Sequence, residues 1–183
     1  MIITITGKPC SGKGTVAKLF CQKHNFDLKS VGNMMRQLAK DNGFDNILEF
    51  QQKGNIADAD KIIDQQVQQI GEQHLDKDIL FDSRLAWFFI PKSFKVFIDV
   101  DWEIAGERLF NAKRENEKVD SIDHATKVLK QRWQTENKRY QKTYNTDNLD
   151  LSNYDFVISS NNKTPEEIAD EIYLNYQKFM QKA

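Results

Sequence analysis

The first fifteen residues restrict the fold of this chain more than any other segment. Three isoleucines among the first five residues predict a buried strand, and an amphipathic helical pattern begins at Gly12-Lys13. Between them lies a G-x-x-x-x-G-K sequence, which in a strand-loop-helix context is a phosphate-binding loop. Backbone N–H groups of such a loop and the positive end of the helix attract phosphate, and Lys13 reaches the outer phosphates.

We therefore expect this loop to bind a nucleoside triphosphate. The alternative is a glycine turn that leads into an ordinary helix. The residues expected to contact ATP are Gly7, Lys8, Pro9, Cys10, Ser11, Gly12, Lys13, Gly14 and Thr15.

The rest of the chain alternates between strand-like and helix-like patterns. Short apolar runs predict strands near 26–29, 79–81, 94–100 and 156–158, with helical segments between them. Helices are expected at about 34–41, in two pieces over 44–74 split near Gly54-Asn55, over 102–144 with a break near 119–121, and after Thr164-Pro165. This alternation predicts an α/β fold with a doubly wound parallel sheet, which binds ligands at the carboxyl ends of its strands.

The composition of the chain limits the cellular location and the binding partners that we expect. The chain has 183 residues, 39% of them hydrophobic, which predicts one domain. A net charge of -1 gives no reason to expect nucleic acid or a membrane surface as partner. Because no apolar run is long enough to span a membrane and Met1 leads directly into the first strand, we expect a cytoplasmic protein without a signal peptide. Two separated cysteines and three scattered histidines predict neither disulfides nor a histidine–cysteine metal site.

All six arginines of the chain follow predicted strands. Arginine pairs bidentately with phosphate, so arginines near strand ends are candidates for phosphoryl transfer, with solvated surface positions as the alternative. Arg36 follows the second strand and Arg84 the third. The charged helical region after the fourth strand contains Arg108, Arg114, Arg132 and Arg139.

A magnesium site is expected beside the loop. Asp82 ends the third strand, where an acidic residue of a phosphate-binding-loop enzyme holds Mg²⁺, usually through water; the alternative is a turn residue. Gly14 follows Lys13, so the hydroxyl that commonly ligates the metal comes one residue later, at Thr15.

Several motifs together resemble the nucleoside monophosphate kinases, and most closely the compact archaeal type of cytidylate kinase. They are Gly7 to Thr15, Ser30-x-Gly32-x-x-x-Arg36, Asp82-Ser83-Arg84-Leu85-Ala86 and Lys138-Arg139-Tyr140-x-x-x-Tyr144-x-x-Asp147. The resemblance implies a monomeric three-layer kinase with strand order 2-3-1-4-5 that transfers the γ-phosphate of ATP to CMP or dCMP, with Mg²⁺. It also implies a monophosphate-binding insert at about 33–75 and a lid at about 108–140.

The resemblance also assigns roles to residues. Arg36 and Arg84, with Gly32, would hold the acceptor, and Asp60 would contact its base or ribose. Lys13, Arg84, Arg108, Arg114, Arg132 and Arg139 would stabilise the transferred phosphoryl group.

The chain departs from the family pattern at Cys10, which replaces a glycine, and at Ser83, Leu85 and Ala86. The departures at Leu85 and Ala86 leave the base unassigned. Two alternatives therefore remain: a kinase of the same fold with another acceptor, and a nucleotide-binding regulatory protein without activity.

Overall fold

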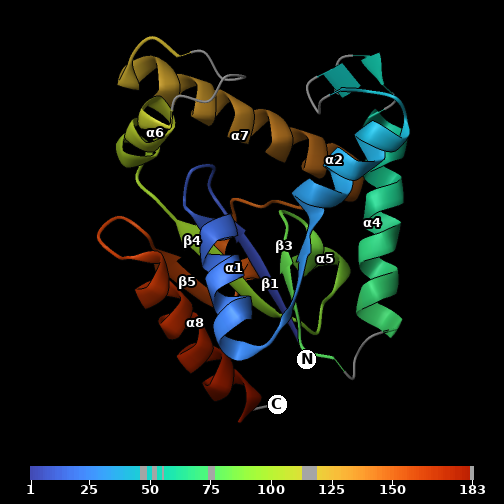
Figure 1. The fold of residues 1–183 in the computed structure, drawn as a ribbon, viewed down its shortest axis with the longest axis vertical. Coiled ribbons are helices and arrows are strands. Elements are labelled where there is room, and N and C mark those ends of the chain that lie inside the picture. The colour runs from blue at the N-terminus through green and yellow to red at the C-terminus, as the bar shows by residue number, and fades with distance from the viewer. Residues whose placement is uncertain (46–48, 51–52, 55, 74–76, 113–118, 182–183) are drawn as a thin grey trace.

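A five-stranded parallel sheet forms the centre of the molecule (Figure 1). The computed structural model describes residues 1–45, 49–50, 53–54, 56–73, 77–112 and 119–181. The strands are β1 (Ile2–Gly7), β2 (Asp27–Ser30), β3 (Ile79–Asp82), β4 (Phe94–Asp99) and β5 (Phe156–Ser159), in the order β2-β3-β1-β4-β5. The predicted α/β class and strand order are confirmed. Because all strands are parallel, their carboxyl ends meet at one edge of the sheet.

The helices lie between the strands, as the sequence pattern predicts. They are α1 (Lys13–His24), α2 (Val31–Asp41), α4 (Ile56–Gln73), α5 (Ala86–Phe89), α6 (Trp102–Asn111), α7 (Ile122–Tyr144) and α8 (Pro165–Met180). Helix α2 begins three residues earlier than expected, because the Ser30 hydroxyl accepts a hydrogen bond from Asn33 N and caps it there. The short helix α5 was not predicted, since four residues carry no periodic signal.

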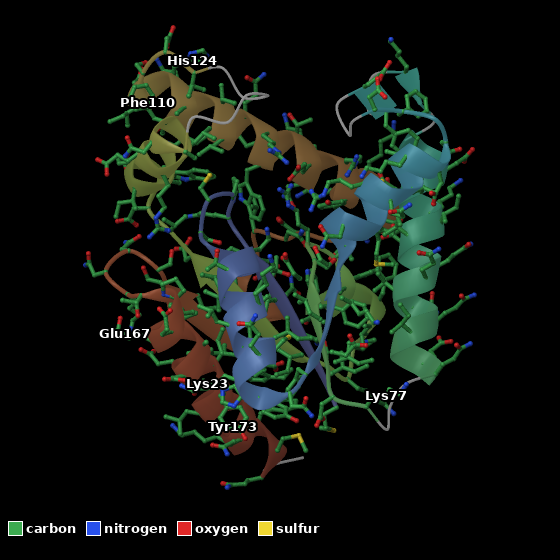
Figure 2. All side chains as sticks on the ribbon, in the orientation of Figure 1. Lys23, Lys77, Phe110, His124, Glu167 and Tyr173 are labelled. Carbon is green, nitrogen blue, oxygen red and sulfur yellow. The ribbon has the colours of Figure 1, made fainter. Side chains whose placement is uncertain are left out.

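Helices α1 and α8 cover one face of the sheet. Alternate residues of the strands, such as Ile3, Ile5 and Val96, point to this face and pack against Phe20 of α1. The two helices also touch each other where the His24 ring stacks on Tyr173, with centroids 3.7 Å apart. Figure 2 labels Tyr173 and Lys23 at this interface.

The opposite face is covered by two groups of helices. Helices α2, α4 and α5 pack over β3 and the start of β1, where Val67 meets Phe81 in one apolar cluster. Farther along, Trp133 of α7 packs with Phe97 of β4 and with Trp87 and Tyr154.

Helices α6 and α7 form a hairpin, labelled in Figure 2 at Phe110 and His124. The two helices of the hairpin approach each other closely where Gly106 of α6 meets Thr126 of α7: a Cβ atom on Gly106 would lie 2.0 Å from Thr126 Oγ1. From there α7 crosses above the loop after β1 and reaches α4 (Figure 1), where Arg139 Nη1 lies 3.1 Å from Asp60 Oδ2. The carboxyl edge of the sheet is thereby covered. No helix in the described part of the chain is long and apolar enough to cross a membrane.

Candidate active site

The loop between β1 and α1 has the backbone shape of an anion cradle. Gly7 cannot carry a side chain, because a Cβ there would lie 2.3 Å from the Ile98 carbonyl oxygen. Gly12 has φ 83° and Cys10 has φ 61°, both in the left-handed region. Cys10 therefore adopts the glycine-like conformation itself, at a cost of about 1 kcal/mol. The geometry suits curled backbone N–H donors around phosphate.

Lys13 is the first of several cations at this edge of the sheet. Its Nζ lies 3.7 Å from Asp82 Oδ1, at the end of β3. Burial lowers the pKa of Lys13; Asp82 opposes this effect, and the nearby cations Arg84 and Arg132 lower the pKa further. The loop lysine thus shares its surroundings with Arg84, which follows β3, and with Arg132 of α7.

Arg84 is the most enclosed of these cations. Its side chain is 18% exposed, and its guanidinium contacts the Glu136 carboxylate of α7. Burial lowers the pKa of Arg84 to about 10, and the cations Arg132 and Arg139 contribute to the lowering. Arg132 Nε lies 3.3 Å from the same carboxylate. We call Lys13, Arg84, Arg132 and Arg139 the cation cluster.

The main chain of Arg84 is fixed by a hydrogen-bond network that sequence reasoning missed. The Arg84 carbonyl accepts from Trp87 Nε1 at 3.1 Å and from Asn148 Nδ2 at 2.9 Å. Asn148 is held in turn by Asn137 of α7, whose Oδ1 accepts from Asn148 N at 2.9 Å. Ser83, a departure from the family pattern, accepts from the backbone N–H of Leu85 and of Ala86 and so shapes the turn after Arg84.

Arg108 is held by two loops at the carboxyl edge of the sheet. Its Nη1 donates to the Cys10 carbonyl at 3.1 Å and to Ser160 Oγ at 3.0 Å, and its Nη2 donates to the Ser160 carbonyl at 2.7 Å. The side chain therefore joins the loop after β1 to the loop after β5. The expected contact of Arg108 with a transferred phosphoryl group stays a prediction, and Arg114 lies outside the described residues.

The acceptor residues predicted on α2 and α4 lie on the other side of the cluster. Arg36 is exposed and extends over Gly32, and it donates to Asn33 Oδ1. Asp60 pairs with Arg139, and burial raises the pKa of Asp60.

One turn farther along α4, Asp64 accepts a hydrogen bond from the Tyr144 hydroxyl of α7. Burial raises the pKa of Asp64 to about 6. Sequence reasoning singled out Tyr144 but not this pair, because no spacing within the chain brings α4 next to α7.

The side chain of Lys8 is engaged on the far side of the loop. Its Nζ lies 2.7 Å from Asp99 Oδ1, donates to the Val100 carbonyl at 3.2 Å, and sits 5.1 Å from the centroid of the Trp102 ring. These contacts all lie at the end of β4 and the start of α6.

The residues beside the loop fit a magnesium ion that is held mainly by phosphates. Asp82 is at the end of β3, and Thr15 is in the first turn of α1 with an exposed side chain. No group of three or more His, Cys, Asp or Glu side chains that could hold a metal occurs among the residues the structure describes. Mg²⁺ commonly binds through one or two carboxylates together with substrate phosphates and water, which this donor set allows.

Comparisons with known proteins agree with the fold and indicate a family. Residues 2–162 match the model of the cytidylate kinase-like family. A cytidylate kinase of Archaeoglobus fulgidus is 33% identical over 174 residues, which are 94% of this chain and 92% of that protein. Shikimate kinase from Aquifex aeolicus aligns over 100% of both chains with a TM-score of 0.63 and 22% identity, a likeness of fold.

A further relative has a different name. An S-adenosylmethionine-dependent nucleotide dehydratase of Lacinutrix mariniflava is 34% identical over 177 residues. The match covers 96% of this chain but only 36% of the dehydratase, so this chain spans about a third of that relative.

Proposed function

This chain belongs to the cytidylate kinase-like family, and we propose that it transfers the γ-phosphoryl group of ATP to CMP or dCMP, giving ADP and the nucleoside diphosphate. One observation carries the proposal. In a chain of this family, Lys13 lies near Arg84 and Arg132, and Arg84 lies near Arg132 and Arg139, beside the loop between β1 and α1. Phosphoryl transfer requires mainly positioning and neutralisation of charge on phosphate oxygens, which these groups supply.

The donor and acceptor occupy different sides of the cation cluster in this proposal. The loop Gly7–Thr15 and Lys13 bind the triphosphate, and Mg²⁺, held by Asp82 through water and by Thr15, neutralises charge on its phosphates. Arg84 and Arg36, with Gly32, hold the acceptor phosphate. Residues of about 33–75 act as the monophosphate-binding insert, with Asp60 toward the base or ribose.

Helix α7 contributes to a lid of about 108–140. Arg132 and Arg139 stabilise the transferred group, and closure excludes water and so limits ATP hydrolysis. Glu136 now contacts Arg84 and lies beside Arg132, so this carboxylate has to leave Arg84 when an acceptor phosphate binds there.

A panel of acceptors tests the proposal. Purified protein with ATP and Mg²⁺ is given CMP, dCMP, UMP, AMP and GMP separately, and ADP formation is followed. We expect the highest kcat/KM with CMP or dCMP, and no ADP formation by a Lys13→Met variant that retains its melting temperature. A higher kcat/KM with AMP, UMP or GMP would overturn the assignment of the base, and ATP binding without any transfer would favour a regulatory protein.

The dehydratase relative supports a second candidate. In that relative, the segment similar to this chain makes up about a third of the protein, and further sequence makes up the other two thirds. We propose as the alternative that this chain phosphorylates a nucleotide that a separate dehydratase then uses. The same panel tests this second candidate if a purified nucleotide dehydratase is added: the dehydratase should consume the kinase product and leave the unphosphorylated acceptor unchanged.

A further inference from the structure

A cavity of about 520 Å³ lies beneath α7, beside the end of β4. Its wall includes the rings of Phe97, Trp102 and Trp133, and Leu149 and Leu151 stand at its edge with 44% and 45% of their surface exposed. The volume lies in the range usual for small-molecule pockets, whose walls are mostly apolar and aromatic. Of the residues that line this space, the proposed kinase reaction uses only Lys8, which belongs to the loop after β1.

The cavity is separated from the cation cluster by α7 itself. Lys130 and Gln134 line the cavity, whereas Arg132 and Arg139 belong to the cluster and Glu136 contacts it. At 100° per residue, positions 130 and 134 fall on one side of the helix, and positions 132, 136 and 139 fall on the other. The two spaces therefore lie on different sides of one helix.

The charges of the lining favour an anion. Two ammonium groups line the cavity, Lys8 and Lys130, and both lie near the Trp102 ring, at 5.1 and 6.0 Å from its centroid. Asp99 is the one carboxylate among the described lining residues, and Lys8 already pairs with it at 2.7 Å. Lys130 thus gives the cavity a net positive charge beside aromatic walls.

We propose that this cavity binds a small aromatic molecule with one negatively charged group, such as an aromatic carboxylate. The ring packs against Trp133 and the two leucines, and the carboxylate pairs with Lys130. A ring between these walls buries apolar surface, and the charge-assisted contact with a half-buried lysine selects the anion.

Two residues of the cavity wall also lie close to residues of the proposed nucleotide site. Lys8 belongs to the loop after β1, and the guanidinium of Arg84 lies 5.9 Å from the centroid of the Trp133 ring. The binding itself does not depend on the proposed kinase function.

Indole-3-acetate and its neutral analogue indole-3-acetamide test the proposal. Their binding to the full chain is measured by saturation-transfer NMR titration, with and without saturating ATP and Mg²⁺. We expect indole-3-acetate to bind about tenfold more tightly than the amide, and equally well in the presence of ATP.

Two matched lysine variants locate the site. Lys130→Gln should remove the preference for indole-3-acetate over the amide. Lys127→Gln, one turn earlier on α7 and paired with the exposed Asp123, should leave that preference unchanged. With wild-type protein, the proposal is overturned if the two probes bind equally, if neither binds at millimolar concentration, or if ATP displaces them. With Lys130→Gln, it is overturned if the variant keeps the preference for indole-3-acetate while its melting temperature is unchanged.

Discussion

Replacement of Arg84 tests the acceptor site most directly. The side chain is 18% exposed, whereas its backbone carbonyl is held by Trp87 and Asn148. Because the network binds the main chain, a change of side chain leaves the turn in place. Arg84→Met removes both the charge and the paired donors, and Arg84→Lys keeps the charge but removes the planar pair of donors.

The magnitude follows from the enclosed position of the guanidinium. A hydrogen bond to a charged group contributes about 1.5–3 kcal/mol, so two such bonds to the acceptor phosphate contribute about 3–6 kcal/mol. Each 1.36 kcal/mol is a factor of ten, so Arg84→Met should lower kcat/KM for the acceptor by about 10² to 10⁴. Arg84→Lys retains one donor and should lower it by about 10 to 10².

The assay measures kcat/KM at saturating ATP, together with the melting temperature of each variant. Lys178→Met, which removes an exposed cation at the end of α8, serves as the control and should behave as the wild type. A folded Arg84→Met variant within tenfold of wild-type kcat/KM would refute the role of Arg84 at the acceptor phosphate.

Two further predictions concern stability. Gly106→Ala places a Cβ 2.0 Å from Thr126 Oγ1 and 3.0 Å from the Ile122 carbonyl, and should lower the free energy of unfolding by about 1–3 kcal/mol in urea titrations. Adding Thr126→Ala should recover part of this loss, and the absence of any recovery would contradict the close α6–α7 contact. Asp64 has a pKa near 6 in the folded protein against 3.8 when unfolded, so the folded state binds the extra proton between these values. Its contribution to stability therefore increases as the pH falls from 6 to 4, by about 1–2 kcal/mol, and is lost as the pH rises through 6. Urea midpoints of Asp64→Asn at pH 4.5 and pH 7 should lack this difference relative to the wild type; an identical pH dependence would show that Asp64 does not titrate near 6.

The fold was predictable because its signals are local. The strand-loop-helix sequence around Gly12-Lys13 and the apolar run ending at Asp82 each lie within a few residues. Arg84 was identified for the same reason, since it follows the end of a strand and parallel strand ends meet at one edge.

The parts of the site that were missed depend on contacts between distant segments. Glu136 sits in a helix rich in lysine and glutamate, where a solvated position is the usual one. Glu136 follows Arg132 by four residues, and this spacing could have indicated an ion pair between the two side chains. The Asp64–Tyr144 contact and the binding of Arg108 to the Ser160 backbone join elements whose approach is set by packing, so no sequence spacing predicts them.

Each cation of the cluster already has a carboxylate beside it, and a substrate phosphate that binds there has to replace this carboxylate. Asp82 lies beside Lys13, Glu136 contacts Arg84 and lies near Arg132, and Asp60 pairs with Arg139. In the proposed reaction, a phosphate group therefore replaces carboxylates of the protein itself and does not bind to cations that lack a neighbouring negative charge. Because few salt ions are released or taken up in such a replacement, acceptor affinity should depend only weakly on ionic strength.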